Sequence, residues 1–264
     1  MPERLNDSIV FSTDDSVARI TLDGGPGNPI TCALADGLAA AVDRCADSIE
    51  DGRARVVVID AEGSAFCVGG DLNEFAAATD RGEHIRQLAD VMHQSIGALA
   101  DIAVPVVSVV QGTVAGGGIG IALAADIILM ADSASMHLAY TAIGLSPDCG
   151  VTWRLKRNLS SAKAFDIALT NRPLSAREAA EAGLISRAVP LTELKVQEQQ
   201  ILSVLSRGPR SAYAETKRLI NGSAEVSLKT HLDDEASTIA RMAASADGIE
   251  GVDAFLGKRS PGYQ

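Results

Sequence analysis

The chain has 264 residues, and its 23 basic and 34 acidic side chains give a formal net charge of −11 at pH 7. With 47% hydrophobic and 22% charged residues, the composition is typical of a folded globular protein and excludes a wholly disordered chain. The acidic balance argues against a nucleic-acid-binding protein, whose surface would need clustered Lys and Arg. The length allows one or two domains with a substantial core.

Several other classes of protein are also disfavoured. No apolar run reaches the roughly 18 residues of a membrane-spanning helix, and the first seven residues lack a signal-peptide pattern, so we expect a cytoplasmic protein without a membrane partner. The four cysteines form no CxxC pair or zinc-like spacing and are predicted to be reduced thiols. The four histidines form no close pair, so no metal site is expected.

The first half of the chain alternates strands and helices. Alternating apolar residues predict a hairpin, β-branched runs predict three buried strands, and helical periodicity predicts the segments between them. Glycine-rich stretches at 24–29, 64–71 and 112–118 are predicted to be loops. In chain order, the expected elements are a hairpin over 9–22, a helix over 33–48, a strand over 56–59, helices from 72 and over 83–100, a strand over 104–110, a helix over 119–125 and a strand over 127–130.

The second half is mostly helical. Helices are predicted over 151–159, 161–169 and 176–181, followed by a strand over 185–189 and three or four helices between 191 and 256. The pattern indicates an α/β body with a helical carboxy-terminal cap. We expect a core over residues 1–200 and a helical region over residues 201–264.

Two glycine-rich loops, Ala65–Asp71 and Ala115–Gly118, each follow a strand and lead into a helix. Peptide N–H groups at the start of a helix have no partner within it, and glycine lets a ligand approach them closely. Two such loops facing each other would form an oxyanion hole, although tight turns alone could also explain the glycines. The sequence after Gly118 does not complete a dinucleotide-binding GxGxxG turn, so no nucleotide cofactor is expected.

Four segments resemble, in order, the motifs of the crotonase (enoyl-CoA hydratase/isomerase) superfamily. They are Ser64–Leu72, Gln111–Gly118, Ile143–Gly150 and Gly251–Pro261. The resemblance covers nearly the whole chain and implies an α/β fold, a spiral of ββα units with a helical carboxy-terminal trimerisation region. It also implies an acyl-coenzyme A thioester as substrate, with coenzyme A bound as part of that substrate and not as a separate cofactor. The expected assembly is a homotrimer or a hexamer.

The resemblance also implies roles for particular residues. The thioester carbonyl would accept hydrogen bonds from the backbone N–H groups of Cys67 and Gly117. Phe255 and Lys258 would reach the coenzyme from a neighbouring subunit, although Lys258 could equally be a solvated surface lysine. The coenzyme arm would run along the first motif, at Ala65, Phe66, Val68, Gly69, Gly70, Asp71 and Leu72.

The sequence departs from the hydratase pattern at both of its glutamates. Gly120 and Tyr140 occupy those positions, and neither glycine nor an ordinary tyrosine is a base at neutral pH. Asp148 matches the aspartate that some isomerases and dehalogenases of the family use, although it could instead cap the following helix. Residues 148–150 and the carboxy-terminal ending look most like the ring-epoxide isomerases of aromatic-acid degradation.

These residues predict an acyl-CoA isomerase in which Asp148 shifts a proton along the acyl chain while the oxyanion hole holds an enolate. Three alternatives stay open. A hydratase could use Asp148 with Tyr140, and a homologue that has lost activity could simply bind acyl-CoA. Asp148 could also displace a halide from an aromatic thioester, which would need an activating histidine, for which His93 is the candidate.

Overall fold

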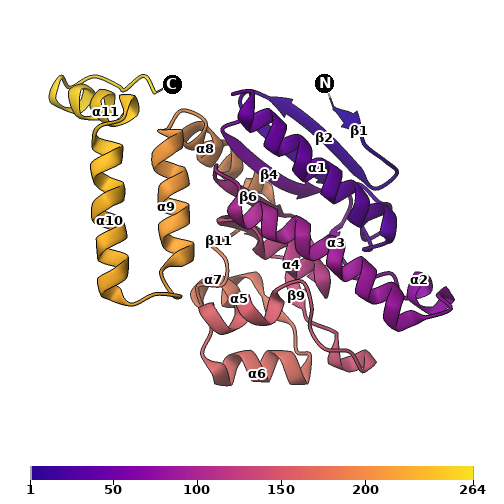
Figure 1. Ribbon diagram of the computed structural model, residues 1–264. Helices are drawn as coiled ribbons and strands as arrows, with labels where there is room; N and C mark the ends of the chain where they lie inside the picture. The colour runs from indigo at the N-terminus through magenta and orange to yellow at the C-terminus, as the bar shows by residue number, and fades with distance from the viewer. Residues whose placement is uncertain (1, 264) are drawn as a thin grey trace.

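The computed structural model describes residues 2–263 and consists of two sheets surrounded by helices (Figure 1). The larger sheet has seven strands in the order β1-β2-β3-β4-β6-β8-β11. The strands at its amino-terminal edge are antiparallel, and β3, β4, β6, β8 and β11 run parallel. The bounds are β1 Glu3–Arg4, β2 Ile9–Asp14, β3 Val17–Leu22, β4 Val56–Ala61, β6 Val106–Val110, β8 Ile127–Ala131 and β11 Arg187–Val189.

The smaller sheet has the order β10-β9-β7-β5, with β5, β7 and β9 parallel. The chain passes from a strand of the large sheet to one of the small sheet and then into helix, as in β4-β5, β6-β7 and β8-β9. This repetition is a spiral of ββα units, and it confirms the predicted α/β fold. The bounds are β5 Ala65–Cys67, β7 Thr113–Ala115, β9 Ser135–His137 and β10 Leu174–Ser175.

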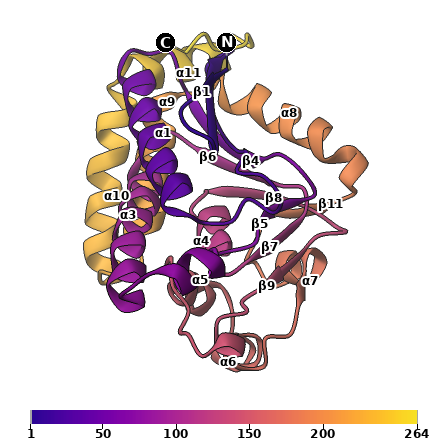
Figure 2. The ribbon, with the colours of Figure 1, turned by 90° about the vertical axis from the view of Figure 1, so that its right-hand side faces the viewer.

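The helices lie on both sides of the large sheet, with α1 and α3 on one side and α8 on the other (Figure 2). Two short 3₁₀ helices span Thr141–Ile143 and Leu191–Glu193. None of the described helices is both long and apolar enough to span a membrane. The bounds are α1 Cys32–Glu50, α2 Leu72–Ala77, α3 Arg81–Asp101, α4 Gly117–Leu123, α5 Val151–Asn158, α6 Ser161–Thr170, α7 Ala176–Glu181, α8 Leu194–Leu205, α9 Arg210–Gly222, α10 Leu228–Ala243 and α11 Ala246–Leu256.

The core is aliphatic and follows the periodicities of the sequence. All four of residues 56–59 in β4 are fully buried, as expected for a parallel strand covered on both faces. Helix α1 begins after Thr31, whose hydroxyl accepts from the Leu34 N–H, and it buries the face that carries Leu34 and Leu38. Burying one such leucine stabilises the fold by about 2 kcal/mol. Strand β4 and helix α1 are therefore firmly packed in the core, and they fix where the loops after them begin.

The predicted loops at 64–71 and 112–118 each contain a strand of the small sheet, β5 and β7, so that part of the prediction is wrong. Both strands are three residues long, and an alternation of period two cannot be recognised in so short a segment. The two strands form because the loops pair with each other, with Ala65 opposite Thr113, 48 residues further along the chain. The two glycine-rich segments are therefore held side by side by a β-ladder.

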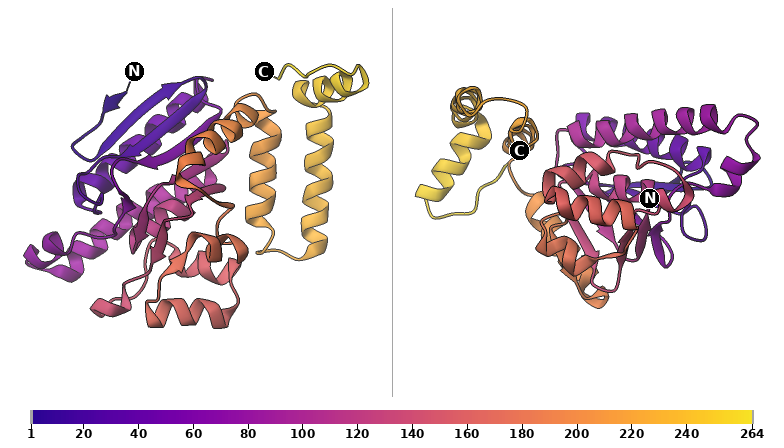
Figure 3. Two further views of the ribbon diagram at one scale, coloured as in Figure 1. Left: turned by 180° about the vertical axis from the view of Figure 1, so that it is seen from behind. Right: turned by 90° about the horizontal axis from the view of Figure 1, so that it is seen from below.

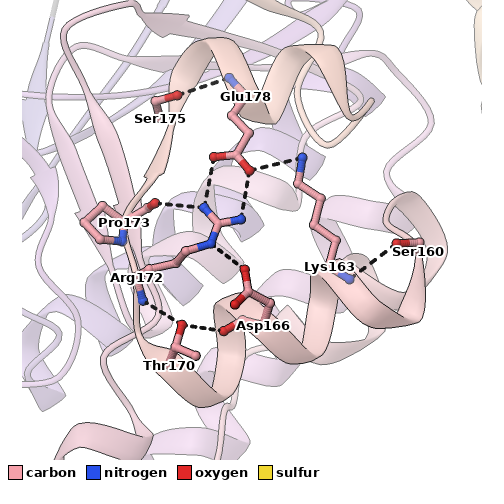
Figure 4. Close-up of polar contacts among 8 residues, drawn as sticks. All are labelled: Ser160, Lys163, Asp166, Thr170, Arg172, Pro173, Ser175 and Glu178. Carbon is pink, nitrogen blue, oxygen red and sulfur yellow. Dashed lines mark hydrogen bonds and ion pairs between the residues drawn. The ribbon is translucent and has the colours of Figure 1, made fainter.

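A group of charges ties α6 to α7 (Figure 4). The Arg172 guanidinium donates to Asp166 at 2.5 Å and to both oxygens of Glu178 at 2.9 and 3.0 Å. Lys163 adds an ion pair to Glu178 at 3.2 Å. The Arg172 hydrogen bond lowers the pKa of Glu178 to about 2, so this carboxylate is ionised at neutral pH.

Helices α9, α10 and α11 stand beside the rest of the molecule (Figure 3). Lys217 anchors α9, because its ammonium donates to the carbonyls of Leu99 and Val104 and pairs with Asp126 at 2.9 Å. The predicted boundary at residue 201 lies inside α8, whose Ile201 is buried in the core. The three helices that stand apart in Figure 3 span residues 210–256.

Candidate active site

A cavity of about 380 Å³ lies where the two glycine turns, α2, α3 and the turn before α5 come together. Asp148 is the only carboxylate among the described residues that line it. A larger hollow of about 840 Å³, between the β2–β3 hairpin and α8, contains none of the predicted site residues. The apolar wall of the smaller cavity includes Ile30, Phe75, Ile85, Leu88, Met92 and Leu145.

The second glycine turn places the Gly117 N–H at the cavity. Gly116, at a positive φ of 49°, precedes α4, and its own N–H donates to the His137 carbonyl at 3.0 Å. Gly117 is the first residue of α4 and lines the cavity, and no described hydrogen bond uses its N–H. A first-turn N–H with no partner carries partial positive charge, so Gly117 offers a donor to an oxygen in the cavity.

The first glycine turn offers its donor at Gly70 and not at Cys67. Cys67 pairs with Val114 in the small sheet, is fully buried and is not among the residues that line the cavity, whereas Gly70 lines it. In the parallel bridge between Ile30 and Gly70, the Ile30 N–H donates to the Gly69 carbonyl, and the Ile30 carbonyl accepts from the Asp71 N–H. The N–H of Gly70 itself therefore points away from Ile30, and no described hydrogen bond uses it.

The left-handed turn at Gly69, with φ of 89°, separates the two positions. An added Cβ at Gly69 would lie 3.1 Å from the Ala115 carbonyl oxygen, so the two glycine turns approach each other closely at this point. Burial raises the pKa of the Cys67 thiol to about 12, which leaves that thiol protonated. Cys67 is a packing residue in this arrangement.

Asp148 also lines the cavity, and its side chain contacts His93 of α3. The Nε2 atom of His93 is 2.5 Å from Asp148 Oδ1, and the same oxygen accepts from the Cys149 N–H at 2.5 Å. The other oxygen, Oδ2, has only a long contact of 3.7 Å with the Cys149 thiol. One oxygen of the carboxylate is therefore fixed by the protein, and the other is available to a ligand.

Asp148 does not cap α5, because the capping position is Gly150, and no side chain accepts from the first turn of that helix. Gly150 and Cys149 both have positive φ, at 71° and 55°. This left-handed pair turns the chain sharply and directs the Asp148 side chain toward α3 instead of along α5. The capping alternative is therefore not what the structure contains.

Gly120 stands where hydratases carry a glutamate, and Cys149 occupies the space beside it. A Cβ atom added to Gly120 would lie 2.3 Å from the Cys149 carbonyl oxygen and 2.4 Å from its Cβ. Backbone cannot yield easily at such a distance, so no side chain fits at position 120 while the turn carrying Asp148 stays in place. The turn that positions Asp148 therefore occupies the space that a glutamate side chain at position 120 would need.

Tyr140 lines the cavity, and its hydroxyl donates to the Asp148 carbonyl at 3.4 Å. Burial, and after it the neighbouring Cys149 and Asp148, raises the pKa of Tyr140 well above its usual range. The tyrosine therefore keeps its proton and is a hydrogen-bond donor at neutral pH, not a base. Burial similarly raises the pKa of the Cys149 thiol.

The other residues of the first motif take different positions. Phe66 is buried in the core, and its carbonyl accepts from the Asn28 amide at 3.1 Å. Val68 and Leu72 are half-exposed apolar side chains. Asp71 caps α2 by accepting from the Asn73 N–H at 2.8 Å. Of the predicted coenzyme-binding set, which also includes Ala65 and Gly69, only Gly70 lines the cavity.

Phe255 and Lys258 lie at the end of α11, which Figure 1 places on the opposite side of the molecule from α2. Phe255 is 84% exposed, and neither residue lines the cavity. Within one chain these two residues do not meet the rest of the site. Their predicted role requires a second chain.

Three comparisons with known proteins agree with this fold. The family description "Enoyl-CoA hydratase/isomerase" matches residues 12–264. The chain belongs to this family, the crotonase superfamily. It is 36% identical over 257 residues to a "Probable enoyl-CoA hydratase" of Rhodobacter capsulatus, covering 97% of each chain. It is 35% identical over 234 residues to the "1,2-epoxyphenylacetyl-CoA isomerase" of Escherichia coli, covering 86% of this chain and 88% of the other.

A solved structure resembles the whole chain as well. The crystal structure of an enoyl-CoA hydratase from a Polaromonas species superposes with a TM-score of 0.91 at 28% identity, covering 97% of this chain and 99% of that one. The family acts on acyl-CoA thioesters. Its members with similar sequences include proteins named as hydratases and as isomerases, so membership alone does not select the reaction.

The sequence analysis missed several residues of the cavity. Phe75, Ile85 and Arg86 line it from α2 and α3, and the apolar periodicity of that region indicated only a buried helix face. Cys149 was assigned no role, yet it borders both Asp148 and Gly120. No signal in the sequence could have shown this, because the contact joins segments 29 residues apart through a left-handed turn.

Proposed function

We propose that the protein is an acyl-CoA isomerase that shifts a double bond by moving one proton. The observation that carries the proposal concerns the described residues: Asp148 is the only carboxylate among those that line the cavity, and the N–H groups of Gly70 and Gly117, which line it too, have no hydrogen bond among them. Cys67, the donor expected from the sequence, is replaced by Gly70 in this proposal. A paired donor set of this kind stabilises a developing oxyanion by about 3 kcal/mol per donor.

The proposed reaction on a 3-enoyl-CoA proceeds through a dienolate. Asp148 takes a proton from C2, the C2–H electron pair delocalises onto the thioester oxygen, and Gly70 and Gly117 donate to that oxygen. The protonated Asp148 then returns the same proton to C4, and the double bond ends between C2 and C3. The thioester stays intact, and neither water nor an oxidant is consumed.

The reacting oxygen of Asp148 is Oδ2. Its other oxygen is held by His93 and by the Cys149 N–H, each at 2.5 Å, and this fixes the plane of the carboxylate. A base that is already oriented loses less conformational freedom when the substrate arrives. His93 is a positioning residue in this proposal, because it touches Asp148 and does not line the cavity.

The test compares Asp148→Asn with the wild-type protein on 2-enoyl-, 3-enoyl- and epoxide-CoA substrates. We expect wild-type turnover of a 3-enoyl-CoA and a loss of 100-fold to 10,000-fold, approximately, in kcat for the variant. Asp51→Asn is the matched control, because Asp51 lies at the exposed end of α1 and pairs only with Arg53. Undiminished isomerisation by Asp148→Asn would remove Asp148 from the mechanism.

A ring-derived acyl group is the substrate class we favour. The 35% identity to the 1,2-epoxyphenylacetyl-CoA isomerase of Escherichia coli supports it, together with the apolar wall of the cavity. The cavity of about 380 Å³ suits a short chain or one ring better than a long acyl chain. Relative kcat/KM for a ring-epoxide thioester and for straight-chain 3-enoyl-CoAs of increasing length measures this preference.

The contact between His93 and Asp148 favours a second candidate, displacement at an aromatic ring. Asp148 Oδ2 would attack the ring carbon that carries a halide, the halide would leave, and an aryl ester of the enzyme would form. Water, losing its proton to His93, would then hydrolyse this ester and regenerate the carboxylate. The distance of 2.5 Å between His93 Nε2 and Asp148 Oδ1 supports such a scheme, because the base would be close to the ester.

Isotopes separate the two reactions. Isomerisation in D₂O transfers or exchanges hydrogen at C2 and C4 and releases no halide. Displacement in H₂¹⁸O releases halide and, in a single turnover, gives a product that carries the unlabelled carboxylate oxygen of Asp148. His93→Gln should reduce displacement far more than isomerisation, because only displacement uses His93 to accept a proton.

A hydratase reaction finds little support in this site. Tyr140 holds its proton, position 120 has no side chain, and Asp148 alone would have to activate water and protonate the acyl chain. Turnover of crotonyl-CoA at the rate of a dedicated hydratase would refute the isomerase proposal. Tight acyl-CoA binding without turnover of any unsaturated thioester would instead indicate a homologue that only binds.

The carboxy-terminal helices support a homotrimer or a hexamer as the working assembly. Their exposed apolar side chains would be covered by a second copy of the chain, and Phe255 and Lys258 would then reach the neighbouring site. Light scattering of the purified protein measures the assembly, and a monomer at micromolar concentration would refute it. The apolar side chains are Leu228, Leu232, Ile239, Ile249, Val252, Phe255 and Leu256.

A further inference from the structure

A second cluster of chemically reactive side chains lies outside the cavity, where α1, α2 and α3 meet. It consists of Cys32 at the start of α1, Glu74 in α2 and His84 in the first turn of α3. The thiol, one carboxylate oxygen and one ring nitrogen all lie within 4.8 Å of one another. The sequence separates the three by 42 and 10 residues, so no metal-binding motif is visible in it.

The spacing between the ligand atoms suits a tetrahedral ion. His84 Nε2 and Glu74 Oε1 are 3.3 Å apart. Two ligands about 2.05 Å from a tetrahedral zinc ion are separated by about 3.4 Å, so these two atoms already have the required separation. The thiol has to move little, because Cys32 is exposed and its sulfur already lies within 4.8 Å of the other two ligand atoms.

The Nε2 atom of His84 is buried and makes no hydrogen bond among the described residues. The His84 ring packs edge-on against Phe75, with ring centroids 5.8 Å apart, and this contact orients Nε2 toward Glu74. A buried nitrogen without a hydrogen bond is unusual, because it has lost its contact with water, and here its contact with Glu74 at 3.3 Å lacks hydrogen-bond geometry. The Glu74 carboxylate accepts from the Cys32 N–H with both oxygens, at 3.2 and 3.4 Å.

We propose that Cys32, Glu74 and His84 form a zinc site with three protein ligands and one water. Thiolate, carboxylate and imidazole are the ligand types that zinc prefers, and the two negative charges balance the charge of the ion. The Cys32 thiol releases its proton to solvent when the ion binds, because a thiol coordinates zinc as the thiolate.

Zinc at this position would brace one wall of the cavity. Glu74 is followed by Phe75, and His84 is followed by Ile85 and Arg86, and all three of these neighbours line the cavity. None of the residues of α2 is fully buried, and Phe75 is the one that packs against the core from this helix. A metal ion that joins α1, α2 and α3 would order this wall without touching the substrate.

Cobalt is the first probe, because a thiolate bound to Co²⁺ gives an intense near-ultraviolet charge-transfer band. When Co²⁺ is added to the purified, reduced, metal-free full-length protein, we expect this band to appear. We expect no such band when Co²⁺ is added to Cys32→Ser. In a competition against a chromophoric chelator, His84→Phe should bind Zn²⁺ weaker by on the order of 100-fold or more. Phenylalanine keeps the aromatic contact with Phe75 and removes only the ligand atom.

His231→Phe is the matched control, because His231 Nε2 lies 3.4 Å from a carboxylate oxygen of Glu235 and has no thiol beside it. This variant should keep the cobalt band and the zinc affinity of the wild type. One equivalent of Zn²⁺ should raise the Tm of the wild type and of His231→Phe, and leave the Tm of Cys32→Ser unchanged. Far-ultraviolet circular dichroism of the metal-free variants checks that each one is folded.

Two results would overturn the proposal. The first is the absence of a thiolate–cobalt band in the reduced wild-type protein. The second is a band that survives in Cys32→Ser and disappears in Cys149→Ser, which would place the ion at His93, Asp148 and Cys149, the other described cluster of this type.

Discussion

Replacing Gly120 by alanine tests the packing that links the lost glutamate to the position of Asp148. The new Cβ would lie 2.3 Å from the Cys149 carbonyl oxygen, and ordinary contacts begin at 3.4 Å. The turn that carries Asp148 must therefore move by about 1 Å or α4 must shift, and overpacking of this kind costs about 2–3 kcal/mol. For a chain of this length that corresponds to a fall in Tm of roughly 5–10 °C.

The same displacement should reduce isomerisation. A carboxylate that is misplaced by about 1 Å loses on the order of 100-fold in rate, so we expect a fall of that size in kcat for Gly120→Ala. Thermal unfolding followed by circular dichroism measures the stability, and turnover of a 3-enoyl-CoA measures the activity. A fall in kcat should appear well below the Tm of the variant.

Gly97→Ala is the control for this substitution. Gly97 lies in the interior of α3, and an added Cβ there meets nothing within 4 Å. Alanine should therefore stabilise the helix by about 0.5–1 kcal/mol. If Gly120→Ala were as stable and as active as Gly97→Ala, position 120 would not be packed against Cys149 and the reasoning would be wrong.

Three further substitutions test other parts of the structure. Asn28→Ala removes a 1%-exposed amide that bonds three carbonyls around β5, and should cost about 2–4 kcal/mol by urea unfolding. Lys217→Met leaves the Asp126 carboxylate without its cation and should cost about 3 kcal/mol, part of which Asp126→Asn restores. Glu178→Gln should cost roughly 1 kcal/mol at pH 7, and its gap from the wild type should close between about pH 5 and pH 2.

The sign of the last effect follows from the lowered pKa of Glu178. A carboxylate with a folded-state pKa of about 2 stabilises the fold above its ordinary pKa of 4.5 and loses that contribution as the pH falls. A difference in stability between the wild type and Glu178→Gln that increased as the pH fell would contradict this. An Asn28→Ala variant that unfolds at the same urea concentration as the wild type would contradict the contacts of Asn28. A Lys217→Met, Asp126→Asn double variant that is no more stable than Lys217→Met would contradict the ion pair between Lys217 and Asp126.

The long periodic segments were predictable from sequence. The strands β4, β6 and β8 and the helices α1, α3 and α5 all lie within about two residues of their predicted bounds, because burial imposes periods of two or 3.6 on such segments. The small sheet was not predictable, since its strands have two or three residues each. Its pairing joins loops that are distant in sequence.

Some residues of the candidate site could likewise be predicted from the sequence, and others could not. Gly117 and Asp148 were singled out by their motifs, and both line the cavity. Cys67 was chosen over Gly70 because the direction of a peptide N–H cannot be derived from a glycine pattern. It depends on the φ of 89° at Gly69 and on the bridge to Ile30, which exists only once the turns have packed together.

By itself, the sequence determined the α/β class, the positions of the long strands and helices, and the absence of both hydratase glutamates, since each of these depends on residue types and on spacings within one element. The tertiary structure alone decided that His93 meets Asp148 across 55 residues, that Cys149 fills the space beside Gly120, and that Cys32 joins Glu74 and His84. Such contacts form between elements whose separation is set by the packing of two sheets and their helices, and local residue preferences contain no information on that distance.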